Sequence, residues 1–154
     1  FALWDQVQRC LFLARDRIGI KPLYYSLDRQ RFRFASTLPA LVASGGVDTG
    51  IDAVGLHHQF TLHGVVPAPH TILKGVTKLA PAHTLKITEQ GVQVPRCYWR
   101  LHAVRPAQPR SEQEAIEQVH EALTLAVRRR LEVADVPVGV LLSGGLDSSL
   151  LVGL

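Results

Sequence analysis

The residues best suited to chemistry lie near the C-terminal end of the sequence, where residues 143–148 read Ser-Gly-Gly-Leu-Asp-Ser. The preceding run, 136–142, is rich in Val and Leu without polar alternation, which predicts a strand buried on both faces of a parallel sheet. Glycines let the backbone approach a ligand closely, and the N-terminus of the helix that follows adds partial positive charge. A strand, a glycine loop and a helix in this order predict a phosphate-binding loop.

The polar side chains of this loop suggest separate roles. The hydroxyls of Ser143 and Ser148 can donate hydrogen bonds to phosphate oxygens, whereas Asp147 can cap the helix or hold Mg²⁺. The segment is not a Walker A loop, because Gly-x-x-x-x-Gly-Lys-Ser/Thr does not occur in it. The alternative is a glycine turn before a buried helix, with no ligand.

The pattern of the first hundred residues indicates antiparallel β-structure with short helices. In the strand over 31–35, a period of two directs Phe32 and Phe34 to the core and Arg31 and Arg33 to water. The predicted elements are strands 1–4, 10–14, 23–26, 31–35, 84–88 and 92–94, a helix over 37–44, and a helix over 52–60 capped by Asp52.

The C-terminal third begins after a change in composition over 101–110, where Pro106 and Pro109 lie among polar residues. Ser111 and Glu114 match a capping box that opens a long helix. The basic run 128–130 falls in its last turn, where positive charge suits the helix dipole. Its predicted buried stripe consists of Ile116, Val119, Leu123, Ala126 and Leu131.

Composition limits the class of protein. The chain has 154 residues, 47% of them hydrophobic, and a net charge of +4, which excludes a disordered chain. No apolar run is long enough for a membrane-spanning helix. The two cysteines, Cys10 and Cys97, cannot form a disulfide framework or a four-cysteine zinc site, so we expect a cytosolic protein. The sequence opens on Phe1 without methionine and closes in an apolar run, so we expect a fragment.

Two other functions fit the pattern less well. His57, His58, His63 and His70 lack a cysteine or carboxylate cluster at metal-ligand spacing. The basic run 128–130 has no interleaved aromatic residues, so it is interpreted as a solvated helix end and not as a nucleic-acid site.

Two motifs resemble known families. Residues 143–148 resemble the pyrophosphate-binding loop of the ATP pyrophosphatase superfamily, whose members split ATP into AMP and pyrophosphate. Residues 14–25 resemble the Arg-Asp-x-x-Gly-x-x-Pro-Leu-Tyr stretch of class II glutamine amidotransferase domains. This domain order is that of glutamine-hydrolysing asparagine synthetases. Further similar segments are 34–36, 66–72, 79–83, 98–99 and 135–137; departures from the family are Ala82, where Gly is usual, and 37–39.

The resemblance implies a fold and a division of the chain. Residues 1–100 would be the C-terminal part of an α+β N-terminal-nucleophile glutaminase sandwich, 101–110 a linker, and 111–154 the start of an α/β parallel-sheet ATP pyrophosphatase domain. The glutaminase nucleophile would be an N-terminal cysteine upstream, so neither Cys10 nor Cys97 is predicted to be catalytic. Arg15, Asp16 and Arg17 are not predicted to be catalytic either; they would shape the glutaminase core or form an ion-pair cluster.

The implied activity is that of an ATP-dependent carbon–nitrogen ligase. Ammonia from glutamine would convert aspartate to asparagine through an acyl-adenylate, with ATP and Mg²⁺ as cofactors. The expected partners are small-molecule substrates, without nucleic acid or membrane, and the expected assembly is a cytoplasmic homodimer. The alternatives are amidation of another carboxylate, such as N-acetylglutaminylglutamine, and a scaffold without catalysis. The predicted ATP and pyrophosphate contacts are Leu141, Ser143, Gly144, Gly145, Asp147 and Ser148.

Overall fold

The computed structural model of the protein describes residues 1–105 and 110–154. The chain separates into two compact units, Phe1–His102 and Ala103–Leu154. Pro106 and Pro109, which marked the expected linker, lie outside the described residues. Each unit is described by itself below.

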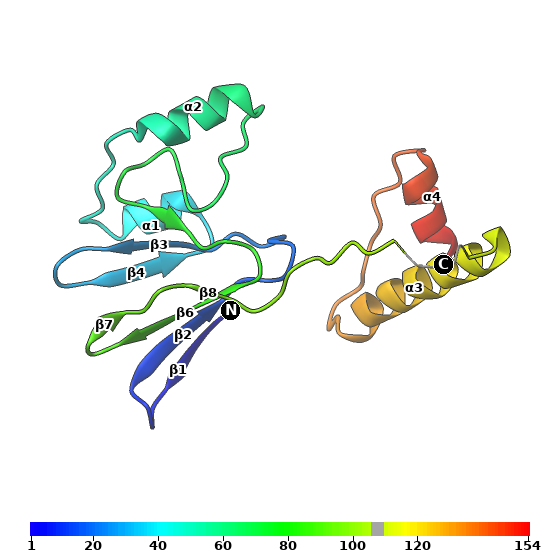
Figure 1. Cartoon of the computed structure of the whole chain (residues 1–154), viewed down its shortest axis with the longest axis horizontal. Helices are drawn as coiled ribbons and strands as arrows, with labels where there is room; N and C mark the ends of the chain where they lie inside the picture. The colour runs from blue at the N-terminus through cyan, green and yellow to red at the C-terminus, as the bar shows by residue number, and fades with distance from the viewer. Residues whose placement is uncertain (106–109) are drawn as a thin grey trace. The chain divides into compact units, whose positions relative to one another are not determined.

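The first unit contains a five-stranded antiparallel sheet, called sheet A (Figure 1). Its strands follow the order β1-β2-β6-β7, and β8 also pairs with β6. The predicted hairpins 1–14 and 84–94 are confirmed, with Asp5 opposite Cys10 and Ile87 opposite Val92. The strands are β1 (Ala2–Asp5), β2 (Cys10–Ala14), β6 (His83–Thr88), β7 (Gly91–Val92) and β8 (Arg96–Cys97).

A second antiparallel sheet, sheet B, has the order β4-β3-β5, with β3 at Tyr24–Leu27, β4 at Phe32–Ala35 and β5 at Thr77–Lys78. Phe32 packs against the core as predicted. Arg31 is exposed as predicted, but the prediction is wrong for the other two residues, because Phe34 is 41% exposed and the Arg33 side chain only 11% exposed. Strand β4 is an edge strand, and the chain at Gly46 passes over the Arg33 guanidinium, which also pairs with Asp28 at 2.6 Å.

The core of the first unit lies between the two sheets. Leu13 and Leu85 come from sheet A, while Leu23 and Leu79 adjoin the strands of sheet B; all four are nearly inaccessible to solvent. Partly buried side chains from both sheets surround them: Leu11, Tyr25, Phe32, Ile87 and Val92. The two antiparallel sheets pack face to face, and together with helices α1 and α2, described next, they form an α+β fold that is consistent with a glutaminase domain.

Two short helices cover the outer face of sheet B (Figure 1): α1 (Leu38–Ala43) and α2 (Ala53–Thr61). Both helices were predicted, and the cap of α2 by Asp52 is confirmed. The Asp52 carboxylate accepts the Gly55 N–H at 2.7 Å, and the Thr37 hydroxyl accepts the Ala40 N–H at 3.4 Å. A Cβ added at Gly55 would lie 1.9 Å from the carbonyl oxygen of Thr71, so glycine permits α2 to approach that segment.

The second unit consists of α3 (Glu112–Glu132) and α4 (Leu146–Gly153). The predicted capping box is confirmed: Ser111 N–H donates to the Glu114 carboxylate at 2.9 Å, and Glu114 N–H donates to the Ser111 hydroxyl at 3.2 Å. The prediction of a buried stripe is wrong, since no residue of α3 is buried. Ile116 and Val119 are 56% and 58% exposed.

The predicted parallel strand over 136–142 is also absent from the structure, where this segment has no strand assignment. Its apolar side chains are exposed, with Leu142 at 60%. A strand requires a neighbouring strand for its backbone hydrogen bonds, and the described part of the second unit offers only helices. Among the helices of the described residues, none is both long enough and apolar enough to cross a lipid bilayer.

Candidate functional site

The Ser-Gly-Gly loop (residues 143–148) is the first candidate site. Gly144 has φ +80°, a conformation that glycine adopts without steric cost, and this turn leads the chain into α4. The turn brings the two predicted serines together, with their hydroxyl oxygens 3.1 Å apart. The Gly145 N–H donates to the Ser143 hydroxyl at 3.4 Å. These hydrogen bonds and the left-handed turn at Gly144 give the loop a defined geometry.

The N-terminus of α4 lies within this loop and has no side-chain cap. Gly145 is the N-cap residue, so the prediction that Asp147 caps the helix is wrong. The hydroxyls of Ser148 and Ser149 donate to the Gly145 carbonyl at 3.1 Å and 2.9 Å and do not cap the helix. The N–H groups of the first turn therefore have no side-chain acceptor. Such N–H groups attract anions, and the Asp147 carboxylate in the same turn offers oxygen ligands to a cation.

The donor set of the loop fits a pyrophosphate group accompanied by Mg²⁺. Nothing lies within 4 Å of a Cβ added at Gly144, so a ligand has open access to the turn. Leu141 is 95% exposed, and the hydrogen bonds that shape the loop join Ser143, Gly145, Ser148 and Ser149 instead. The structure thus joins Ser143, Gly145 and Ser148, while Leu141 stays apart.

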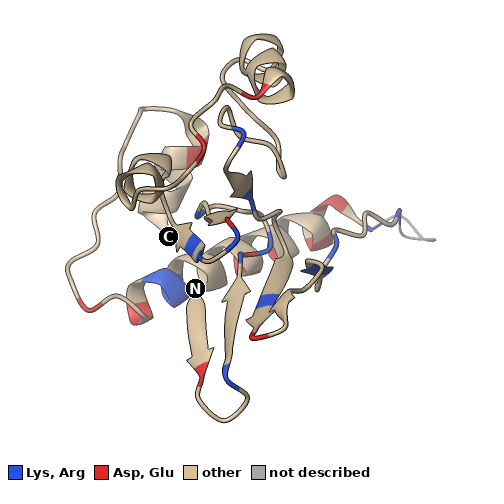
Figure 2. Ribbon diagram, turned by 90° about the vertical axis from the view of Figure 1, so that its left-hand side faces the viewer, with Lys and Arg blue, Asp and Glu red and all other residues tan. Residues whose placement is uncertain are grey.

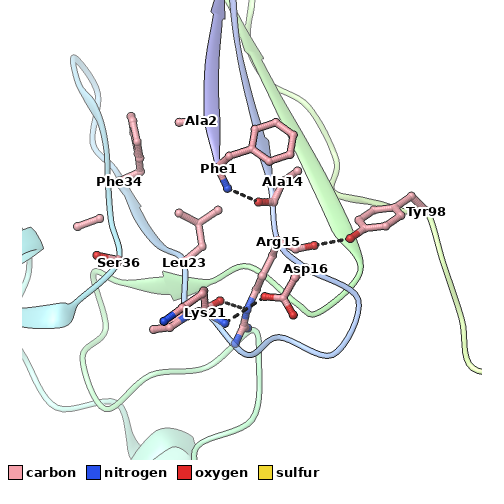
Figure 3. A pocket seen from close by; sticks show the side chains of 12 residues that line it. Phe1, Ala2, Ala14, Arg15, Asp16, Lys21, Leu23, Phe34, Ser36 and Tyr98 are labelled. Atoms are coloured by element: carbon pink, nitrogen blue, oxygen red, sulfur yellow. Dashed lines mark hydrogen bonds between the residues drawn. The ribbon is translucent and has the colours of Figure 1, made fainter. Parts of the chain in front are cut away.

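The second candidate site lies in the first unit, around Arg15 (Figure 3). Arg15 is 8% exposed, and its guanidinium donates only to backbone carbonyls. It reaches the carbonyl oxygens of Lys21 at 3.0 Å, Gly19 at 2.8 Å and Leu79 at 2.6 Å. Arg15 therefore joins the 16–21 loop to the end of β5.

Asp16 holds the same loop from within. Its carboxylate accepts the N–H groups of Ile18 at 3.3 Å, Ile20 at 2.9 Å and Lys21 at 3.0 Å. Burial raises the pKa of Asp16, but the backbone N–H groups outweigh this effect and hold the pKa below its usual value. Of the two alternatives considered for Arg15, Asp16 and Arg17, the ion-pair cluster does not form: Arg15 and Asp16 bond backbone groups, and the Arg17 guanidinium lies 5.7 Å from the centroid of the Trp99 ring.

A pocket of about 550 Å³ opens beside Arg15. Figure 3 shows Lys21 and Asp16 on one side of it and Phe34 and Ser36 on another. The hydroxyl of Tyr98 donates to the Arg15 carbonyl at 2.7 Å and ties the segment after β8 to this wall. Sequence reasoning predicted Phe34 only as a core residue and assigned no role to Tyr98 or Ser36, although all three lie in segments that resemble the amidotransferase family.

Ala82 shows why glycine is usual at its position. Its φ is +56°, in the left-handed region that favours glycine, and its side chain is 4% exposed. Its N–H donates to the Asp16 carbonyl at 2.9 Å, and its carbonyl accepts the Tyr98 N–H at 2.9 Å. The turn therefore holds alanine in the left-handed conformation at the position where the family usually has glycine.

The cysteines and histidines form no such site. Cys10 is 3% exposed in β2, which confirms it as a core residue, and Cys97 is exposed. Within 1–105 and 110–154, no three side chains of metal-ligating type are grouped to hold an ion. His58 instead stacks obliquely with His70, the ring centroids being 6.0 Å apart.

Comparison with known families decides the identity of the first unit. Residues 1–99 match the family model described as "Glutamine amidotransferase domain". The chain belongs to this glutamine amidotransferase domain family. A second family model, described as "Asparagine synthase", matches residues 118–154 and so includes the Ser-Gly-Gly loop. In the amidotransferase domain, Arg15 and Asp16 have the positioning contacts described above.

Individual relatives align along the whole chain. Asparagine synthetase (glutamine-hydrolysing) 3 of Bacillus subtilis is 37% identical over 155 residues, which is 100% of this chain and 24% of the relative. Putative asparagine synthetase (glutamine-hydrolysing) 2 of Methanocaldococcus jannaschii is 35% identical over 100% of the chain and 30% of its own length. Amidase chry2 of Gibberella zeae is 35% identical over 100% of the chain and 22% of its own length. The chain thus spans about a quarter of the length of these relatives.

Proposed function

We propose that this chain is part of a glutamine-hydrolysing asparagine synthetase. The observation that carries the proposal is the succession, in one chain, of a glutamine amidotransferase match over 1–99 and an asparagine synthase match over 118–154. The first unit would contribute to a site that hydrolyses glutamine to glutamate and ammonia. The second would contribute to a site where aspartate is activated as an acyl-adenylate and ammonia, passed between the sites, forms the amide.

The Ser-Gly-Gly loop would hold the phosphates of ATP. Two observations support this role: the N-terminus of α4 has no side-chain cap, and the hydroxyls of Ser143 and Ser148 lie 3.1 Å apart beside it. Free N–H groups and hydroxyls stabilise the negative charge that develops on departing pyrophosphate. Bound Mg²⁺ would supply further charge neutralisation, and Asp147 is the residue of this loop that would contact it. Gly144 and Gly145 would allow close backbone approach, and Leu141 would lie against the nucleotide.

The proposal includes a division of the chain and a fold for its second part. Residues 1–100 would be the C-terminal part of the glutaminase domain, 101–110 the linker, and 111–154 the start of an ATP pyrophosphatase domain. The exposed apolar run 136–142 supports this, since its Val and Leu side chains suit a strand of a larger parallel sheet. A cysteine nucleophile upstream of Phe1, a cytoplasmic location and a homodimer complete the proposal.

One substitution separates the two half-reactions. In the full-length protein with ATP, Mg²⁺, glutamine and aspartate, Asp147→Ala should abolish formation of AMP and asparagine while glutamine hydrolysis continues. Glu132→Ala, which removes an exposed carboxylate at the end of α3, is the matched control and should leave both activities intact. Equal loss of both activities in Asp147→Ala, or no loss of either, would contradict the assignment of the loop to ATP.

The names of the relatives reported above do not favour N-acetylglutaminylglutamine as the acceptor. Nucleic-acid binding also gains no support from charge. Arg129 and Arg130 share the C-terminal part of α3 with Glu132, and Figure 2 shows acidic and basic residues along the same helix.

A further inference from the structure

A small pocket lies on the outer face of sheet B, on the side of the helices and away from the core. Its volume is about 140 Å³. Tyr24 of β3 and Lys78 of β5 are directly opposite in the sheet and both line it. The remaining lining residues come from α1, α2 and the connection between α2 and β5: Leu38, Gln59, Gly64, Val66, Thr71 and Ile72.

Lys78 is the one charged side chain among these lining residues. Its ammonium donates to the Val66 carbonyl at 2.6 Å and lies 5.7 Å from the centroid of the Tyr24 ring. An ammonium has three N–H donors, so the Val66 carbonyl uses one of them. Within the part of the chain that the structure describes, no carboxylate forms an ion pair with Lys78.

The surroundings disfavour the positive charge of this side chain. Burial lowers the pKa of Lys78, and the positive charge of Arg15 lowers it further. A partly buried cation without a counter-ion is destabilising unless an anion or further acceptors reach it. The hydroxyl of Thr71, which also lines the pocket, is engaged by the backbone: it shares its hydrogen between the carbonyls of Leu73 and Val76 and accepts the Leu73 N–H at 3.1 Å.

We propose that this pocket binds a small oxyanion, with Lys78 as its counter-ion. The volume corresponds to roughly four or five water molecules of bulk liquid, which suits a phosphate ion or a short carboxylate. The two unused donors of Lys78 would bond its oxygens, and two further lining residues, Tyr24 and Gln59, carry side-chain donors that would add to them. None of these residues belongs to the Ser-Gly-Gly loop or to the Arg15 pocket, so the site is independent of the proposed synthetase activity.

The test is an NMR titration of the chain with its lysine side chains isotope-labelled, at pH 7 and constant ionic strength. Sodium phosphate and sodium acetate are added in separate experiments, and the ε-methylene signal of each lysine is followed. The Lys78 signal is assigned by its loss in Lys78→Arg. We expect that signal to shift saturably with at least one of the two anions, while the exposed Lys21 and Lys74 show only a small linear change. The anion that saturates identifies the source, phosphate or carboxylate.

Variants separate binding from general charge screening. Lys78→Gln should weaken the binding of that anion about tenfold or more, because a charge-assisted contact is lost. Lys78→Arg should retain most of the affinity, and Lys74→Gln, which removes a charge from an exposed position nearby, should leave it unchanged. Equal linear shifts at all lysines, or no saturation with either anion in the wild-type chain, would overturn the proposal whether or not Lys78→Gln folds.

Discussion

Replacing Arg15 tests whether its side chain stabilises the amidotransferase unit through the carbonyls that it joins. In Arg15→Ala, the Leu79 carbonyl would be left without a partner in a buried position, at a cost of about 1–3 kcal/mol. The carbonyls of Gly19 and Lys21 are partly accessible to water, so each lost bond should cost about 0.5–1.5 kcal/mol. We therefore expect a loss of about 2–6 kcal/mol in the free energy of unfolding of this unit.

Arg15→Lys refines the test, because an ammonium cannot reproduce the planar fork that reaches all three carbonyls. We expect this variant to lose about 1–3 kcal/mol, less than Arg15→Ala. Urea unfolding followed by tryptophan fluorescence measures this unit, because the two tryptophans, Trp4 and Trp99, both lie in it. With a slope of about 2 kcal/mol per molar urea, Arg15→Ala should lower the midpoint by about 1–3 M.

The exposed Arg29→Ala is the control and should not move the midpoint. The reasoning is refuted if Arg15→Lys unfolds at the wild-type midpoint. It is also refuted if Arg29→Ala lowers the midpoint as much as Arg15→Ala does, since net charge would then explain the effect.

Two further predictions concern the same unit. The N–H of Gln30 and the Arg33 side chain lower the pKa of Asp28 from 3.8 to about 2, so the stabilising contribution of Asp28 is present above about pH 4 and is lost as the pH falls towards 2. The urea midpoints of wild type and Asp28→Asn should therefore converge between about pH 4 and about pH 2. A difference that stays constant over this range would contradict the prediction. Gly55→Ala should destabilise the unit by about 1–3 kcal/mol in urea unfolding, against the usual helix preference for alanine, because the added Cβ would lie 1.9 Å from the Thr71 carbonyl oxygen. Val54→Ala, at an exposed position of the same helix, should change the stability by less than about 0.5 kcal/mol, and equal effects of the two substitutions would show that the Thr71 contact is unimportant.

Local patterns in the sequence were sufficient to predict much of the first unit. Alternating residues and polar turns predicted the β1–β2 and β3–β4 hairpins, and the caps Asp52 and Ser111 predicted the starts of α2 and α3. Strands β5 and β8 were missed, because two residues carry no measurable alternation and their pairing depends on distant partners.

Tertiary contacts explain the other differences. A charge cluster at Arg15 and Asp16 looks the same in sequence whether it forms ion pairs or bonds carbonyls, and the decisive acceptor, Leu79, is 64 residues away. The amphipathic pattern of α3 predicts an apolar face but does not identify what covers it. Motif chemistry predicted the Ser-Gly-Gly loop, and the structure adds the approach of Ser143 to Ser148 and the uncapped start of α4.

The most direct test of the central proposal is the reaction itself. The full-length protein is incubated with ATP, Mg²⁺, glutamine and aspartate, and the nucleotide and amino-acid products are followed together. The account predicts AMP, pyrophosphate, glutamate and asparagine, each dependent on ATP except the glutamate. Glutamine hydrolysis without AMP, whichever carboxylate is supplied, would contradict the assignment of the second unit to an ATP-dependent synthetase.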